Sequence, residues 1–149
     1  MLSTIEKTII LKTVDTFAGT PDNVLAEVAA LLKEVELQVG DTIFKKGDPG
    51  DCMYIIVSGE VRVHDGAHTL NYLAEGTVFG EMAVLDSEPR VAAVTASEDT
   101  LLLRLDQEPF YELMEDRIEI ARGIIRALAF HLRNCDHNIV EAKTRLKEP

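Results

Sequence analysis

A short run of residue types suited to binding an anion lies near the middle of the 149-residue sequence. Gly80 has no Cβ atom, so its N–H group can approach an anion without a steric clash. Residues 80–85 are expected to form a short helix whose first free N–H groups face the same anion. Arg90 adds a planar guanidinium that matches phosphate oxygens and stays charged at any physiological pH.

An acidic residue inside this run points to a second property of the ligand. Glu81 directly follows Gly80, and an ionised carboxylate can only accept hydrogen bonds. Beside a phosphate it needs a donor, and a ribose 2′-hydroxyl is such a donor. The flanking carboxylates of Asp86 and Glu88 allow another interpretation, in which Arg90 pairs with them at the surface and the pocket is vestigial.

The whole run, residues 79–94, resembles the phosphate-binding cassette of cyclic-nucleotide-binding domains. The family pattern is Phe-Gly-Glu, an aliphatic residue, Ala, an aliphatic residue and Leu, followed after a gap by Pro-Arg-x-Ala. Residues 44–63 are similar to the family's glycine-punctuated strands, so the resemblance covers roughly residues 15–135. It implies a 3′,5′-cyclic purine nucleotide as ligand, bound by Phe79, Gly80, Glu81, Met82, Ala83, Pro89, Arg90, Val91 and Ala92, with Val63 and Leu70 as further apolar walls.

One position departs from the family pattern. Many members place Ser, Thr or Ala directly after the arginine, and Thr there resembles the version that favours cGMP. Val91 stands at this place and offers no hydrogen bond. The resemblance therefore predicts cAMP as the preferred ligand, with cGMP weaker.

Composition and charge exclude several other classes of protein. The sequence has 15 basic and 26 acidic residues, and its net charge of −11 opposes binding to nucleic acid. No apolar run reaches the length of about 18 residues that a membrane span needs, and the amino terminus lacks the features of a signal peptide. Cys52 and Cys135 form neither a disulfide framework nor a metal-binding spacing. We therefore expect a cytoplasmic protein with reduced thiols.

The sequence shows no pattern typical of catalysis or of a metal site. Its histidines, His64, His68, His131 and His137, are scattered, and no nucleophile motif or phosphate loop is present. We expect a protein that is not an enzyme and that needs no metal and no cofactor.

The first part of the chain, residues 1–34, is predicted to be helical. Ser3 and Glu6 fit a capping box at the start of a first helix. Thr20 is expected to cap a second helix, with Pro21 at its first position.

The middle part, residues 35–105, is predicted to form short antiparallel strands. Turn sequences recur about every ten residues, and Asp65-Gly66 is typical of a hairpin turn. This pattern indicates a roll or barrel, and the family resemblance implies a β-roll. With helices over residues 107–146, the predicted fold is one α+β domain spanning residues 1–149: an antiparallel β-roll with amino-terminal helices and a long carboxy-terminal helix.

The last predicted helix, residues 117–146, carries two apolar stripes. The first, called the seam below, repeats at alternating steps of three and four residues: Ile118, Ala121, Ile125, Leu128, Leu132, Cys135, Ile139, Ala142 and Leu146. The second consists of Ile120, Ile124 and Ala127. We expect the second stripe to pack on the roll and the seam to form a parallel homodimer. The alternative is that the seam only packs on its own roll.

Taken together, these patterns favour a sensor that binds cAMP and thereby repositions its last helix. Cys135 and Asp136 are candidates to close over the base by position only. The alternative is a degenerate fold that dimerises or binds partners without nucleotide. A DNA-binding regulator is not expected, because the sequence ends where a helix-turn-helix would begin and its charge opposes DNA.

Overall fold

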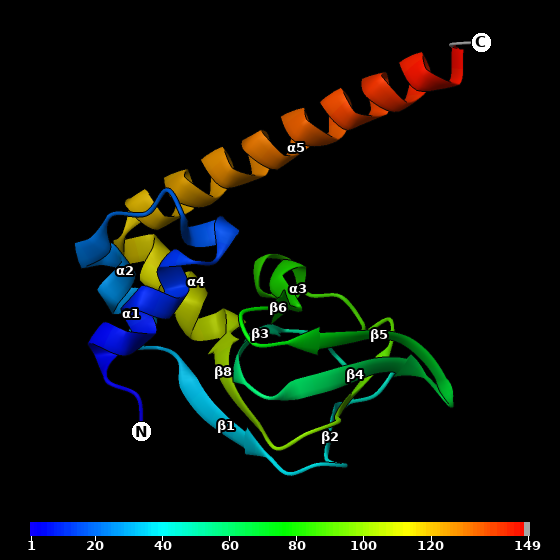
Figure 1. The fold of residues 1–149 in the computed structure, drawn as a ribbon. Coiled ribbons are helices and arrows are strands. Elements are labelled where there is room, and N and C mark those ends of the chain that lie inside the picture. Colours follow the sequence, from blue (N-terminus) through cyan, green and yellow to red (C-terminus); the bar gives the residue numbers. More distant parts are fainter. Residues whose placement is uncertain (148–149) are drawn as a thin grey trace.

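The computed structural model describes the backbone of residues 1–147 and the side chains of residues 1–135. Helices from both ends of the chain lie together on one side of a roll of strands (Figure 1). The helical elements are α1 (Thr4–Lys12), the 3₁₀ helix η1 (Asp15–Phe17), α2 (Asp22–Ala29), the short α3 (Glu81–Leu85) within the roll, α4 (Gln107–Asp116) and α5 (Ile118–Lys147).

The roll consists of two four-stranded sheets, in the orders β1-β8-β3-β6 and β2-β7-β4-β5. All of the strand pairs are antiparallel. The strands are β1 (Lys33–Leu37), β2 (Thr42–Phe44), β3 (Cys52–Ser58), β4 (Glu60–Asp65), β5 (His68–Ala74), β6 (Val78–Phe79), β7 (Ala93–Ala96) and β8 (Thr100–Asp106). The predicted α+β fold with an antiparallel β-roll is confirmed, and so is the predicted hairpin, because β4 and β5 pair on either side of Gly66.

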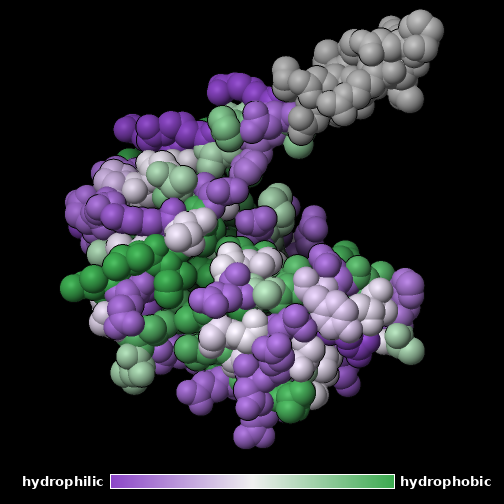
Figure 2. All heavy atoms as spheres, viewed as in Figure 1, coloured by the Kyte–Doolittle hydropathy of each residue, from purple (hydrophilic) through white to green (hydrophobic). Residues whose placement is uncertain are grey.

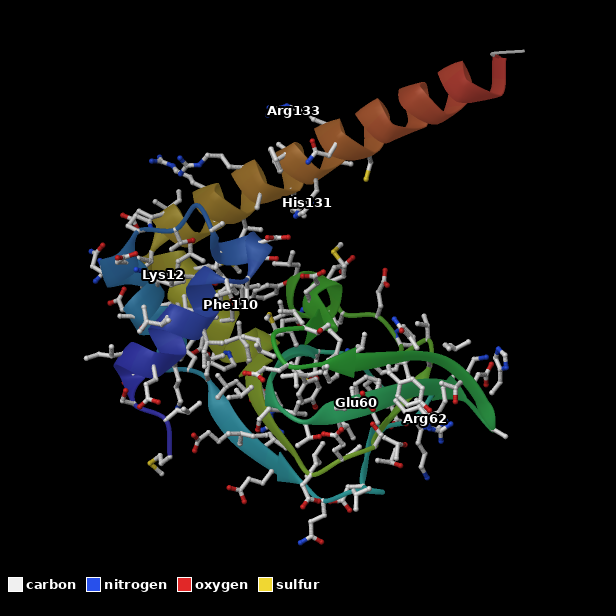
Figure 3. The ribbon with its side chains drawn as sticks, in the orientation of Figure 1. Lys12, Glu60, Arg62, Phe110, His131 and Arg133 are labelled. Carbon is white, nitrogen blue, oxygen red and sulfur yellow. The ribbon has the colours of Figure 1, made fainter. Side chains whose placement is uncertain are left out.

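Two apolar clusters fill the molecule. One joins the helices to the roll, where the rings of Phe17 and Phe110 meet edge to face at 5.8 Å. Figure 3 shows Phe110 among the helices beside the roll, and Figure 2 shows hydrophobic residues gathered in a band at the same level. The other cluster lies inside the roll, where Tyr54 stacks on Phe79 at 5.1 Å and Phe44 packs against both. This inner cluster lies directly beside the segment that resembles the cassette.

The start of the chain follows one predicted capping signal and departs from the other. Ser3 and Glu6 form the predicted capping box on α1. The predicted cap at Thr20 is wrong, because α2 has Pro21 at its N-cap and no side-chain cap bond. Thr20 is only 6% exposed and packs against α5, where a Cβ added to Gly123 would lie 2.9 Å from the Thr20 hydroxyl. Tertiary burial therefore directs this side chain away from the amides of α2.

Helix α5 packs through one of its two apolar stripes. Ile120 and Ile124 are 0% and 5% exposed, so the second stripe is buried as expected, but α5 packs mainly against η1, α2 and α4 rather than against strands of the roll. The seam residues Ile118, Ile125 and Leu132 are instead 57%, 64% and 67% exposed. The body of the protein therefore leaves most of the described part of the seam exposed, although Ala121 is half-buried. The seam residues Ile139, Ala142 and Leu146, and the lid candidate Asp136, lie outside the residues whose side chains are described.

Within residues 1–147, no helix combines the length and the apolar character that crossing a membrane would require.

Candidate ligand-binding site

The two sequence motifs that carry the family resemblance form one structural unit. Three backbone hydrogen bonds join the loop before β3 to the segment around Arg90: Gly47 N–H to Arg90 O at 2.7 Å, Arg90 N–H to Asp48 O at 2.8 Å, and Glu88 N–H to Gly50 O at 3.2 Å. This loop, residues 45–51, is called the glycine-rich loop below. Its backbone hydrogen bonds hold the backbone around Arg90 in place.

The side chain of Arg90 is buried, with 8% exposure. Its Nη2 donates to the carbonyl oxygen of Cys52 at 2.8 Å and to the Cys52 sulfur at 3.3 Å. Its Cζ lies 4.3 Å from the centre of the Phe44 ring, within the range of a cation–π contact. Its Nε is buried and has no hydrogen-bond partner among the described residues. The charge is thus held by neutral groups.

The alternative in which Arg90 is a surface ion pair does not fit this geometry. Among the described residues, the ion pairs of the structure include none between Arg90 and either Asp86 or Glu88. A buried charge without an opposite charge is costly, since transfer from water is compensated only by pairing or hydrogen bonding. An anionic ligand would supply the missing negative charge.

Glycine is required at two places around the guanidinium. Gly80 is the N-cap of α3 and has a φ of +73°, in the left-handed region that favours glycine. A Cβ on Gly80 would lie 2.6 Å from Arg90 Nη1, and a Cβ on Gly50 would lie 2.2 Å from Glu88 O and 3.2 Å from Arg90 Nε. Side chains at these two positions would therefore displace the arginine. The predicted short helix is confirmed as α3, whose N-cap, Gly80, lies close to Nη1. In its first turn, the N–H of Ala83 already donates to Gly80 O at 3.0 Å.

A cavity of about 250 Å³ opens beside the guanidinium. Its lining includes most of the predicted ligand contacts, namely Val63, Phe79, Gly80, Met82, Ala83, Pro89, Arg90 and Val91. It also includes Phe44, Glu88 and Val94, which were not predicted as contacts. Phe44 is the last residue of β2, directly before the glycine-rich loop. Its place at the start of residues 44–63, which resemble the family's strands, is the feature of the sequence that could have identified it as a lining residue.

The structure places three predicted contact residues outside this lining. Glu81 is exposed at the start of α3, Leu70 is 54% exposed on β5, and Ala92 is buried at 5% exposure. Glu81 and Leu70 are next to lining residues in the fold, because Glu81 lies between Gly80 and Met82 and Leu70 is on the strand paired with β4. Ala92 contributes to the interior rather than to the cavity surface.

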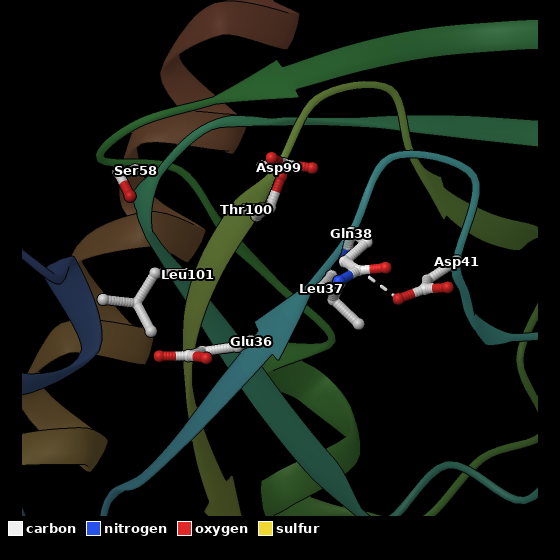
Figure 4. A pocket seen from close by; sticks show the side chains of 8 residues that line it. All are labelled: Glu36, Leu37, Gln38, Asp41, Ser58, Asp99, Thr100 and Leu101. Carbon is white, nitrogen blue, oxygen red and sulfur yellow. Dashed lines mark hydrogen bonds between the residues drawn. The ribbon is translucent and has the colours of Figure 1, made fainter.

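A second and larger cavity, of about 510 Å³, lies at the turn between β1 and β2 (Figure 4). Two of its three carboxylates already bind backbone amides: Asp41 accepts from Gln38 N–H at 2.9 Å, and Asp99 accepts from Val39 N–H at 3.0 Å. These residues stabilise the turn, which gives this cavity a structural explanation. Within the described part of the chain, no group of three or more acidic, histidine or cysteine side chains is arranged to hold a metal ion.

The chain belongs to the family of the cyclic nucleotide-binding domain, whose model matches residues 34–117. Among curated proteins it is 30% identical, over 137 residues, to the CRP-like cAMP-activated global transcriptional regulator of Mycobacterium tuberculosis, covering 89% of this chain and 61% of that protein. It is 35% identical, over 117 residues, to the cAMP-dependent protein kinase regulatory subunit of Dictyostelium discoideum, covering 73% of this chain and 34% of that protein. The chain thus spans only part of the length of these relatives.

A solved structure agrees with this assignment over nearly the whole fold. The N-terminal domain of a transcriptional regulator from Streptomyces coelicolor A3(2) superposes with a TM-score of 0.81 at 32% identity. The match covers 87% of this chain and 94% of that domain. The family resemblance predicted from the cassette is confirmed.

Proposed function

We propose that the chain is a non-catalytic sensor that binds a 3′,5′-cyclic purine nucleotide, with cAMP preferred over cGMP. The observation that carries this proposal is the buried guanidinium of Arg90, which lies beside Gly80 at a cavity and has no carboxylate partner among the described residues. The cyclic phosphate would neutralise this charge and accept hydrogen bonds from Nη1 and from the first amides of α3.

The remaining groups fit the other parts of a nucleotide. Glu81 is exposed at the start of α3, so its carboxylate is free to accept the ribose 2′-hydroxyl. Val63, Met82 and Val91 provide apolar surface for the purine, and Met82 and Val91 are 58% and 84% exposed without ligand. A flat base would bury this apolar surface. Because Val91 has no hydroxyl, cGMP would gain no contact there, and this supports cAMP as the better ligand.

Ligand binding would reach the long helix through side chains of α4. Gln107 Nε2 donates to Ala83 O at 3.3 Å, and the Tyr111 hydroxyl donates to Leu85 O. Both acceptors are carbonyls of α3, so a shift of α3 on binding would change these contacts. Helix α4 ends at Asp116, and its C-cap Arg117, with a φ of −129° and a ψ of 82°, separates it from α5. The ligand would bias α5 between two positions through its different affinity for them.

The exposed seam supports a parallel homodimer through α5. Ile118, Ile125 and Leu132 occupy a positions of the heptad, where branched residues favour two strands. Cys135 is exposed and, at a d position, would lie next to its copy in the partner. The two free cysteines fit a reducing cytoplasmic compartment, and the net charge of −11 disfavours contact with nucleic acid by this domain.

Calorimetric titration with cAMP and cGMP tests the proposed function directly. The control ligand is 5′-AMP, which carries the same base and ribose but has an open phosphate. We expect cAMP to bind more tightly than cGMP, and 5′-AMP to bind weakest. Absence of heat and of a thermal shift with every nucleotide would favour the alternative of an interaction module without nucleotide.

A further inference from the structure

Cys52 contacts the guanidinium of Arg90 in a way that the cassette pattern does not predict. Cys52 begins β3 and is 7% exposed. Nη2 of Arg90 lies 3.3 Å from its sulfur and 2.8 Å from its carbonyl oxygen. Any residue at this position would supply the carbonyl, but only the cysteine supplies the sulfur.

The guanidinium of Arg90 lies between two cavities, and its orientation decides toward which of them its N–H groups point. Arg90 and Phe44 line both the cavity of about 250 Å³ and a neighbouring cavity of about 470 Å³, which is distinct from the one at the β1–β2 turn. This neighbouring cavity is lined by Cys52 and by three carboxylates. Asp106 is already paired with Arg104 and Lys33. Asp48 accepts from Lys45 N–H, which leaves Asp51 as the acidic group toward which Arg90 could turn. A guanidinium that is free to move therefore has an acidic group to turn toward, away from the first cavity.

Gly50, Gly80 and Phe44 pack closely around Arg90, but few hydrogen bonds fix the orientation of its guanidinium. The Phe44 ring holds the face of the guanidinium at 4.3 Å but does not fix its orientation within the plane. Nε has no partner among the described residues, so the two contacts of Nη2 with Cys52 set that orientation. With Nη2 on Cys52, Nη1 lies close to Gly80, the N-cap of α3, where an added Cβ would be 2.6 Å away.

We propose that Cys52 is a positioning residue for the phosphate of the ligand, because its sulfur holds the guanidinium of Arg90 in the orientation that places Nη1 beside Gly80. This inference rests on the proposed function. Loss of the sulfur lowers the fraction of molecules whose arginine is ready to bind, and the apparent affinity falls by the same factor.

The first test compares the affinity of cAMP for two variants of Cys52 with that for the wild-type protein. Cys52→Ala removes the sulfur and is expected to weaken cAMP about three- to tenfold, a modest loss because a thiol sulfur is a weak acceptor and the bond from Nη2 to the Cys52 carbonyl remains. Cys52→Ser restores an acceptor and is expected to recover part of the loss. Ile56→Val is the matched control, because Ile56 is a buried residue of the same strand and cluster and lines neither cavity. It should lower the melting temperature without changing the affinity.

The second test needs no nucleotide. Nitrogen-15 NMR of the free protein reports rotation of the arginine head group through the resonances of its Nη protons. In the wild-type protein, Arg90 should show slow rotation and a protected Nε proton, because Nε is buried. Cys52→Ala should accelerate both the rotation and the exchange, and Ile56→Val should not.

The outcomes separate the two proposals. If wild-type protein binds cAMP and Cys52→Ala binds it equally well or more tightly, Cys52 is not a positioning residue, although the proposed function stands. Equal losses for Cys52→Ala and Ile56→Val would also overturn the inference, since general destabilisation would explain both. If the wild-type protein binds no nucleotide, the proposed function itself fails, and the inference about ligand affinity fails with it.

Discussion

Replacing Arg90 by alanine tests the central argument, because it removes the guanidinium that lies buried beside Gly80. Hydrogen bonds that involve a charged group contribute about 1.5–3 kcal/mol, so cAMP affinity should fall about ten- to hundredfold. The free protein should lose little stability. The lost bond to Cys52 O and the lost contact with Phe44 are offset by removal of a buried charge without a carboxylate partner.

The rise in melting temperature on addition of cAMP measures this loss of affinity. A ligand at about one hundred times its Kd stabilises the folded protein by about 2.7 kcal/mol, which is a rise in Tm of about 5–11 °C for a protein of this size. At the same concentration, a hundredfold weaker Kd leaves about 0.4 kcal/mol and a rise of about 1–2 °C. Arg90→Lys keeps the charge without the planar fork, and its affinity should lie between those of the wild type and Arg90→Ala.

Two results would refute the reasoning. Wild-type affinity in Arg90→Ala would show that the phosphate binds elsewhere. A fall of many degrees in the Tm of the free variant would show that the arginine is mainly structural.

Three further predictions address other contacts. Glu81→Gln should weaken cAMP and barely affect 2′-deoxy-cAMP in calorimetry, whereas equal losses would exclude Glu81 as the ribose contact. Ile125→Asp should give monomers in light scattering, and mild oxidation of the wild type should crosslink Cys135 to its copy without unfolding; a wild-type monomer at high concentration with no crosslink would mean that the seam forms no dimer. The hydrogen bond from Arg117 lowers the pKa of Glu27 below 4.5, so this pair contributes stability above that pH and loses it as the pH falls through the folded pKa. Acid titrations of Tm should therefore converge for the wild type and Glu27→Gln at low pH, and a constant difference at every pH would contradict this sign.

Much of the site was predictable because its requirements are local. Gly80 was expected for its backbone freedom and Arg90 for its donors, and both lie where the cassette pattern implied. The packing of Arg90 was not predictable in the same way. Its partner Cys52 is 38 residues away in the sequence, and neither periodicity nor turn chemistry says which buried strand residue a side chain will meet.

The fold shows the same division between local and tertiary effects. The capping box of Ser3 followed from sequence because both of its partners are within one turn. Thr20 had the right residue type for a cap, but burial against α5 outweighed the local preference. For α5 the periodicity correctly separated two stripes, and the exposure of Ile125 against the burial of Ile124 shows which one faces the body.

Because the non-helical residue Arg117 separates α5 from α4, a small rotation at Arg117 would produce a large movement at the far end of α5. Helix α5 has 30 residues, and at 1.5 Å per residue its axis is about 45 Å long. A rotation of about 10° at Arg117 would move the far end by about 8 Å, although the atoms near Arg117 would move by much less. A change too small to alter the packing of the roll would thus become a displacement larger than a side chain. If ligand binding rotates α5 as proposed, this displacement would be the signal, and a partner paired with the far end of α5 would receive it.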